Sequence, residues 1–199
     1  MQSETSRIEA FSDGVFAIAI TLLILEIKIP TPAKGSLAVA LLQQWPSYLA
    51  FLMSFAFIGI MWINHHRLFT HIRRSNDVLL ILNLLLLLGV TIVPFPTAVL
   101  AAYLGDRDQR VAAMLYNGTY FVIALLFNIL WHYSVSRQLL DKSTLPFSQN
   151  ISRQYALGPV MYLICLALAW FSVPASLAIN GVLAIFFVLP PELLKKRNG

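Results

Sequence analysis

Residues 7–26 read RIEAFSDGVFAIAITLLILE, and this stretch decides the fold class. Residues 14–25 carry no charge and belong to the first of six apolar stretches. A helix of about 20 apolar residues crosses a bilayer, and the fifth and sixth stretches are shorter than this average. The six predicted spans cover residues 11–29, 46–68, 78–101, 111–134, 155–171 and 174–189. We therefore expect one all-α integral membrane domain over residues 1–199, with six transmembrane helices.

The composition of the whole chain agrees with a membrane protein. Of its 199 residues 58% are hydrophobic and 12% are charged, whereas soluble domains have about 45–50% and about 25%. This much apolar surface exceeds what a soluble core of the same length would hide. Pro94 and Pro96 are expected to kink the third span, and the short segment 172–174 predicts a tight helical hairpin between the fifth and sixth spans.

The basic residues indicate how the spans are oriented. With six spans both termini lie on one side, and ten of the 14 Lys and Arg fall on that side, against four on the other. The ten are Arg7, Arg67, Arg73, Arg74, Arg137, Lys142, Arg153, Lys195, Lys196 and Arg197, and the four are Lys28, Lys34, Arg107 and Arg110. Because cytoplasmic loops carry the excess of basic residues, both termini are predicted to be cytoplasmic. The net charge of +5 thus has a topological explanation that involves no nucleic acid.

Other functional classes leave no pattern in the sequence. A single cysteine, Cys165, excludes a disulfide framework within the chain. His65 and His66 are adjacent, hence about 100° apart on a helix, which does not suit one metal ion. We predict no metal site, no cofactor, no nucleic-acid partner and no enzymatic activity, because nucleophile constellations and phosphate-binding glycine loops are also missing from the sequence.

The first span has one nearly uniform apolar face. With Ile18 at zero and 100° per residue, one side of the helix within about 60° holds Phe11, Gly14, Thr21, Leu22 and Leu25. Asp13 falls about 140° away, so its carboxylate is expected to point toward the helix packed behind. Possible partners at the same depth are Arg7 and the second-span residues Trp62, Asn64, His65 and His66, which together would form a polar lock between the two helices.

Two sequence motifs resemble those of the transmembrane protein 175 family of potassium channels. Arg7, Phe11, Ser12 and Asp13 fit R-x-x-x-F-S-D, and residues 62–66 read WINHH. The resemblance extends over the whole chain as one six-span unit, which looks like the prokaryotic members of the family. It implies a homotetramer in which the first helix of each copy lines a central pore without a TVGYG filter.

The resemblance also implies roles for individual residues. It places the narrowest ring of the pore at Ile18, Leu22 and Leu25 further along the pore, and a selectivity-related hydroxyl at Thr21. It further implies a polar network of Arg7, Ser12 and Asp13 with Trp62, Asn64, His65 or His66.

These expectations predict a potassium channel of modest selectivity. A ring of apolar side chains closes a pore by dewetting, because an ion passing it loses water without gaining polar ligands. The expected partners are other copies of the chain, the lipid bilayer and monovalent cations, with K⁺ as the permeant ion. The alternative is a proton-coupled secondary transporter, in which Asp13 and the histidines relay protons. The sequence lacks the paired Gly/Pro-broken helices typical of such carriers.

Overall fold

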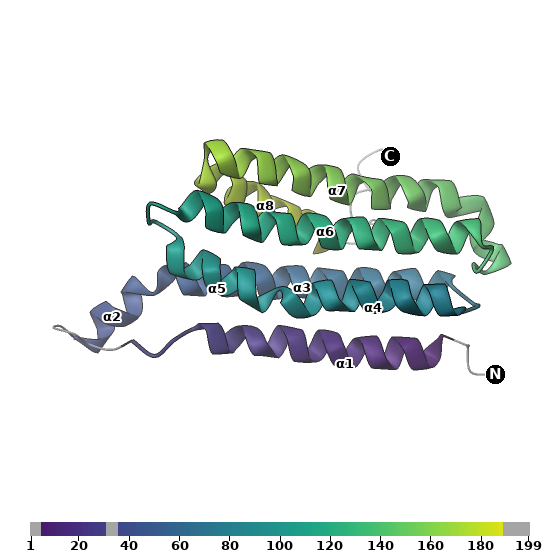
Figure 1. Cartoon of the computed structure of the whole chain (residues 1–199), viewed down its shortest axis with the longest axis horizontal. Helices are drawn as coiled ribbons and strands as arrows, with labels where there is room; N and C mark the ends of the chain where they lie inside the picture. Colours follow the sequence, from purple (N-terminus) through teal and green to yellow (C-terminus); the bar gives the residue numbers. More distant parts are fainter. Residues whose placement is uncertain (1–4, 31–35, 189–199) are drawn as a thin grey trace, which may run out of the picture.

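The computed structural model describes residues 5–30 and 36–188 as an all-helical chain. Figure 1 shows the long helices running side by side in one bundle, with α1 along one edge. The elements are α1 (Ser6–Leu22), the 3₁₀ helix η1 (Leu23–Glu26), α2 (Leu37–Gln43), α3 (Trp45–His71), α4 (Asp77–Ile92), α5 (Pro94–Tyr103), α6 (Gln109–Ser136), the 3₁₀ helix η2 (Lys142–Phe147), α7 (Ser148–Phe171) and α8 (Val173–Val188).

Five helical segments are long and apolar enough to cross a membrane. They are Ser6–Glu26, Trp45–His71, Asp77–Tyr103, Gln109–Ser136 and Ile151–Phe171. The chain is thus a multi-pass membrane protein. The sixth predicted span corresponds to α8, which has 16 residues and is shorter than the usual span of about 20. The predicted end of that span at residue 189 lies outside the described residues, so the count of six spans remains a prediction.

The first span is shifted toward the N-terminus relative to its predicted limits of 11–29. It begins at Ser6, where the Thr5 hydroxyl donates a hydrogen bond of 2.9 Å to the Glu9 carboxylate. The acidic Glu9 of the first turn is favoured by the helix dipole although it lowers the hydropathy, so the helix begins before the predicted span. The α-helix ends at Leu22 and tightens into η1, after which the backbone is extended at Ile27.

Prolines and a single linking residue set two sharp boundaries. The third span breaks into α4 and α5 at Val93, with Pro94 at the start of α5. Proline lacks an N–H and is favoured at the first position of a helix, which explains this break in the place where the sequence predicted a kink. Only Ser172 separates α7 from α8, in agreement with the predicted tight hairpin.

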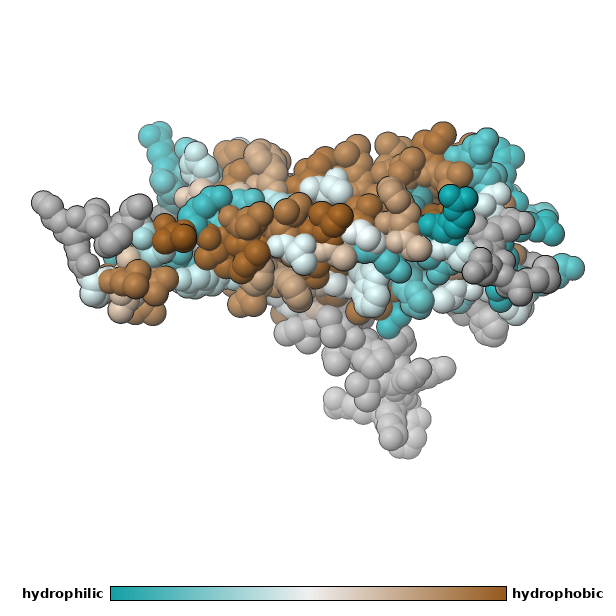
Figure 2. Space-filling view, turned by 90° about the horizontal axis from the view of Figure 1, so that it is seen from below, coloured by the Kyte–Doolittle hydropathy of each residue, from teal (hydrophilic) through white to brown (hydrophobic). Residues whose placement is uncertain are grey.

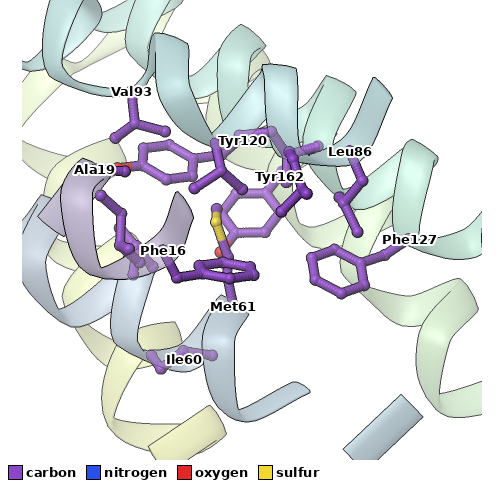
Figure 3. Close-up of a cluster of buried hydrophobic side chains, with 14 of the residues drawn as sticks. Phe16, Ala19, Ile60, Met61, Leu86, Val93, Tyr120, Phe127 and Tyr162 are labelled. Atoms are coloured by element: carbon purple, nitrogen blue, oxygen red, sulfur yellow. The ribbon is translucent and has the colours of Figure 1, made fainter. Parts of the chain in front are cut away.

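The helices share one hydrophobic core. Figure 3 shows buried side chains that converge from different helices, among them Phe16 of α1, Met61 of α3, Leu86 of α4, Tyr120 of α6 and Tyr162 of α7. The helix α6 packs along α7, whereas α1 packs on α3 and α4. The bundle is therefore built around α3 and α6, and α1 lies at its periphery.

Buried hydrogen bonds tie the helices together inside the bundle. The Ser54 hydroxyl lies 2.7 Å from that of Thr97 and 3.0 Å from that of Tyr116, which links α3, α5 and α6. The Asn180 amide of α8 donates to the Asn117 carbonyl oxygen of α6 at 2.8 Å. In lipid such contacts replace the hydrophobic attraction between helices, so these residues fix helix positions.

Two loops meet at the end of the bundle that holds the N-terminus of α1. Ile72 and Leu140 form an isolated antiparallel bridge, and the Arg73 guanidinium lies 2.9 Å from the Asp141 carboxylate. The Ser143 backbone N–H and hydroxyl donate to the same carboxylate. These hydrogen bonds, with Arg73, lower the pKa of Asp141 from 3.8 to about 2.

Candidate functional site

The helix α1 has two different faces. The face toward α3 and α4 is buried and consists of Ile8, Ser12, Phe16 and Ala19, continued by Leu23 of η1. The opposite face is exposed in the isolated chain, with Phe11 at 57%, Ile18 at 61%, Leu22 at 43% and Leu25 at 63% exposure. This exposed face carries the residues that the sequence predicted to line a pore.

The exposed face belongs to a broad apolar surface. Figure 2 looks at the molecule from the α1 side and shows hydrophobic residues over its middle, with hydrophilic residues gathered toward the ends. An exposed apolar surface of this extent is covered by lipid or by another protein chain. Thr21 is the single hydroxyl residue among the predicted pore-lining positions.

The Thr21 side chain presents an oxygen atom on this face. Its hydroxyl lies 2.9 Å from the carbonyl oxygens of Ala17 and Ile18 in the preceding turn. A hydroxyl has one proton and two lone pairs. Because the proton is used within the helix, the Thr21 oxygen keeps its lone pairs free of these contacts.

The 3₁₀ turn changes the position of Leu25 on the helix. In an α-helix Leu25 would lie about 60° from Leu22, whereas at three residues per turn the two side chains stack. Leu25 is exposed as Leu22 is, so it continues the column formed by Ile18 and Leu22.

Asp13 lies at the edge of the buried face of α1, where a residue of the second span, α3, holds its carboxylate. Its carboxylate accepts a hydrogen bond of 2.9 Å from the Trp62 indole N–H of α3. The Trp62 ring in turn stacks on His66, with ring centroids 6.5 Å apart. Asp13 itself is exposed in the isolated chain, so it is anchored by α3 without being enclosed by it.

A second, fully buried chain of hydrogen bonds joins three helices. Asn83 of α4 donates from its amide nitrogen to the Ser12 hydroxyl oxygen at 3.0 Å, and its carbonyl oxygen lies 2.9 Å from His65 Nε2 of α3. The Ser12 hydroxyl donates to the Ile8 carbonyl oxygen at 2.7 Å. His65 is therefore connected to the first helix through Asn83, by a route separate from that of Trp62 and His66.

Sequence reasoning missed Asn83. Its signal was present, because it is the one polar residue within the apolar run 78–88, and polar groups inside a span usually have partners. The sequence does not reveal how α4 is rotated about its axis, and this rotation turns Asn83 toward Ser12 and His65.

Two predicted members of the polar network lie elsewhere. Arg7 is exposed, and no ion pair joins it to Asp13 in the part of the chain that the structure describes. Asn64 is half-buried on the far side of α3, where its backbone carbonyl accepts a hydrogen bond of 3.3 Å from the Tyr155 hydroxyl of α7. Their membership of the network remains a prediction.

Comparison with known proteins identifies the family of the chain. The family described as endosomal/lysosomal potassium channel TMEM175 matches residues 7–94. A potassium channel of Chamaesiphon minutus is 51% identical over 193 residues, covering 94% of this chain and 95% of that protein. The chain belongs to the TMEM175 family. It is thus related to cation channels and not to enzymes.

Other TMEM175 relatives and structures extend the comparison. The crystal structure of a lysosomal potassium-selective channel TMEM175 homolog from Chamaesiphon minutus superposes with a TM-score of 0.87 at 49% identity, covering 94% of this chain and 97% of that chain. The endosomal/lysosomal proton channel TMEM175 of Homo sapiens is 36% identical over 147 residues, which cover 66% of this chain and 29% of the human protein.

In this TMEM175 family member a groove lies beside the Asp13 carboxylate. It has a volume of about 360 Å³ between α1 and α3 and is lined by Asp13, Phe16, Ala17, Ile20, Ile58, Gly59 and Trp62. Apart from Asp13 and the Trp62 N–H, its lining is apolar. Within residues 5–30 and 36–188, no three His, Cys, Asp or Glu side chains are grouped as metal ligands.

Proposed function

We propose that the chain forms a modestly potassium-selective channel as a homotetramer, with α1 of each copy around a central pore. One observation carries the proposal: the face of α1 with Ile18, Leu22 and Leu25 is exposed, whereas its opposite face is packed on α3 and α4. A pore-lining helix needs this division, because one face must hold it in its own subunit while the other borders the axis.

The position of α1 at the edge of the bundle supports assembly from several copies. A permeation path lined by repeated first helices requires symmetry about an axis, which one chain does not have. The groove beside Asp13 and Trp62 lies along α1, and its apolar lining provides a surface on which a neighbouring copy can pack. Four copies bring four Ile18 side chains into one ring.

The chemistry of the exposed face supports the selectivity and gating parts of the proposal. Rings of Ile18, Leu22 and Leu25 exclude water from a narrow pore, so the pore conducts only when the rings widen. The Thr21 oxygen supplies a weak ligand next to Ile18. K⁺ sheds water more easily than Na⁺, so a constriction with the Thr21 oxygens beside Ile18 favours K⁺ modestly. The sequence contains no TVGYG filter that would give stronger selectivity.

The distribution of charge supports cytoplasmic termini. The seven described basic residues predicted for the cytoplasmic side lie in α1, α3 and α7 or in the segments 72–76 and 137–147, which follow α3 and α6. They are Arg7, Arg67, Arg73, Arg74, Arg137, Lys142 and Arg153. Lys28, Arg107 and Arg110 belong to the opposite end. The other four basic residues of the charge count, Lys34, Lys195, Lys196 and Arg197, lie outside the described ranges.

Planar-bilayer recording of the purified protein tests the proposal. Ile18→Asn hydrates the ring, so unitary K⁺ conductance should rise about twofold or more and the preference for K⁺ over Na⁺ should fall. Leu84→Asn places the same amide at an exposed site of α4, where Leu84 is 53% exposed, and should leave both quantities unchanged.

Two results would overturn parts of the proposal. Equal conductance and ion preference in wild type and Ile18→Asn would remove Ile18 from the constriction. Saturable, proton-coupled flux without single-channel steps would favour the transporter instead.

A further inference from the structure

A cavity of about 150 Å³ lies between α3, α6 and α7, away from α1. Its apolar part is formed by Ile60 and Met61 of α3 and by Ile123 and Phe127 of α6. Figure 3 shows Met61 and Phe127 beside Tyr162 of α7 in this region. An apolar cavity of about this volume holds a group of the size of benzene or a short alkyl chain.

The cavity changes from apolar to cationic along α3. The lining residues Ile60, Asn64, Arg67 and His71 are spaced by four, three and four residues, so they share one face of the helix. They extend over about 16 Å, from eleven residues at a rise of about 1.5 Å. The apolar end lies in the middle of the span, and Arg67 and His71 lie at the end where the loops 72–76 and 137–147 meet.

Arg67 is the charged group of this cavity. It is half-buried. In the described part of the chain the ion pair within 4.0 Å joins Arg73 to Asp141, so no carboxylate is paired with Arg67. A guanidinium presents five N–H donors suited to carboxylate or phosphate oxygens. Tyr155 does not compensate this charge, because its phenol is neutral; its hydroxyl donates to the Asn64 backbone carbonyl.

We propose that this cavity binds an anionic amphiphile, with its carboxylate or phosphate at Arg67 and its apolar tail between Met61 and Phe127. The two halves of such a ligand match the two ends of the cavity. A cationic amphiphile of the same length would place its head against Arg67, and a neutral one would leave the guanidinium without a counter-charge. The site is separate from the proposed ion path, because its lining residues come from α3, α6 and α7.

Calorimetric titration of the full chain in phosphatidylcholine nanodiscs tests this site with octanoate and octylammonium. Octanoate should bind at least tenfold more tightly than octylammonium, and Arg67→Gln should weaken octanoate binding at least tenfold. Arg153 is exposed on α7 outside the cavity, so Arg153→Gln is the matched control and should bind as wild type does. Ala124 lines the cavity, so Ala124→Leu should fill part of its volume. This variant should also lose octanoate binding, although it keeps the charge of Arg67.

Several outcomes would overturn the proposal. They are equal binding of the two probes, equal binding in wild type and Arg67→Gln, undiminished binding in a folded Ala124→Leu protein, or binding of neither probe. A second arm identifies the natural source of the anion. Phosphatidylglycerol retained in native mass spectra by wild type, and lost from Arg67→Gln, indicates a membrane lipid; octanoate binding without retained phosphatidylglycerol indicates a free carboxylate.

Discussion

Replacing Asn83 by leucine should loosen the contact between α1, α3 and α4. Asn83 is 2% exposed and makes two side-chain hydrogen bonds, to the Ser12 hydroxyl at 3.0 Å and to His65 at 2.9 Å. Each bond contributes about 0.5–1.5 kcal/mol in general, and about 0.6 on average between membrane helices. Leucine has a similar size, so packing is largely kept.

The larger part of the loss comes from His65. This ring is 1% exposed, so Asn83→Leu leaves a buried imidazole nitrogen without its partner, at a cost of about 1–3 kcal/mol. Ser12 retains its hydrogen bond to the Ile8 carbonyl and adds less. We therefore expect the free energy of unfolding to fall by about 2 kcal/mol, as measured by SDS titration in maltoside micelles with helical circular dichroism.

A matched control and a double-mutant cycle make this prediction specific. Asn128 of α6 is half-buried, with no side-chain hydrogen bond in the ranges the structure describes, so Asn128→Leu should change stability by less than about 0.5 kcal/mol. Ser12→Ala combined with Asn83→Leu should show a coupling of about 0.5–1.5 kcal/mol. A loss in Asn83→Leu no larger than that in the control, or strict additivity with Ser12→Ala, would refute the network as a stabilising unit.

Two further predictions concern Asp13 and Asp141. Trp62→Phe removes the donor to the Asp13 carboxylate and should lower the free energy of unfolding by about 1 kcal/mol; no loss in the same SDS titration would mean that solvent replaces this bond. The pKa of Asp141 is lowered from 3.8 to about 2 by the Ser143 hydrogen bonds and Arg73. The resulting stabilisation is present above pH 3.8 and is lost as the pH falls through about 2. Wild type should therefore melt at a higher temperature than Asp141→Asn from pH 7 to pH 5, with the difference vanishing toward pH 2, and a difference independent of pH would contradict the assignment.

Five of the six predicted spans correspond to helices long and apolar enough to cross a membrane, because length and apolar content have simple physical consequences. The ends of the first span were placed less well. Arg7 and Glu9 lower the hydropathy of a turn that is nevertheless helical, and the 3₁₀ turn at Leu23–Glu26 leaves no periodic signal. The short helix α2 was missed because seven residues, all at least partly exposed, give little periodicity.

The candidate site was predictable within α1 and less so between helices. The 100° step placed Ile18, Leu22 and Leu25 on one face of the helix, and all three are exposed. Contacts across helices depend on how each helix is rotated, which the sequence of one chain does not supply. For that reason Trp62 was among the partners considered for Asp13, whereas the connection from Ser12 through Asn83 was not expected.

Water access to Ile18 in the assembled protein tests the central claim most directly. The native Cys165 is fully buried, so a cysteine placed at Ile18 becomes the reactive thiol in bilayer recordings with a cationic methanethiosulfonate reagent. We predict that the reagent removes most of the K⁺ current of Ile18→Cys and leaves that of Leu84→Cys, at an exposed site of α4, unchanged. A current in Ile18→Cys that is unaffected by the reagent while the pore is conducting would contradict the account.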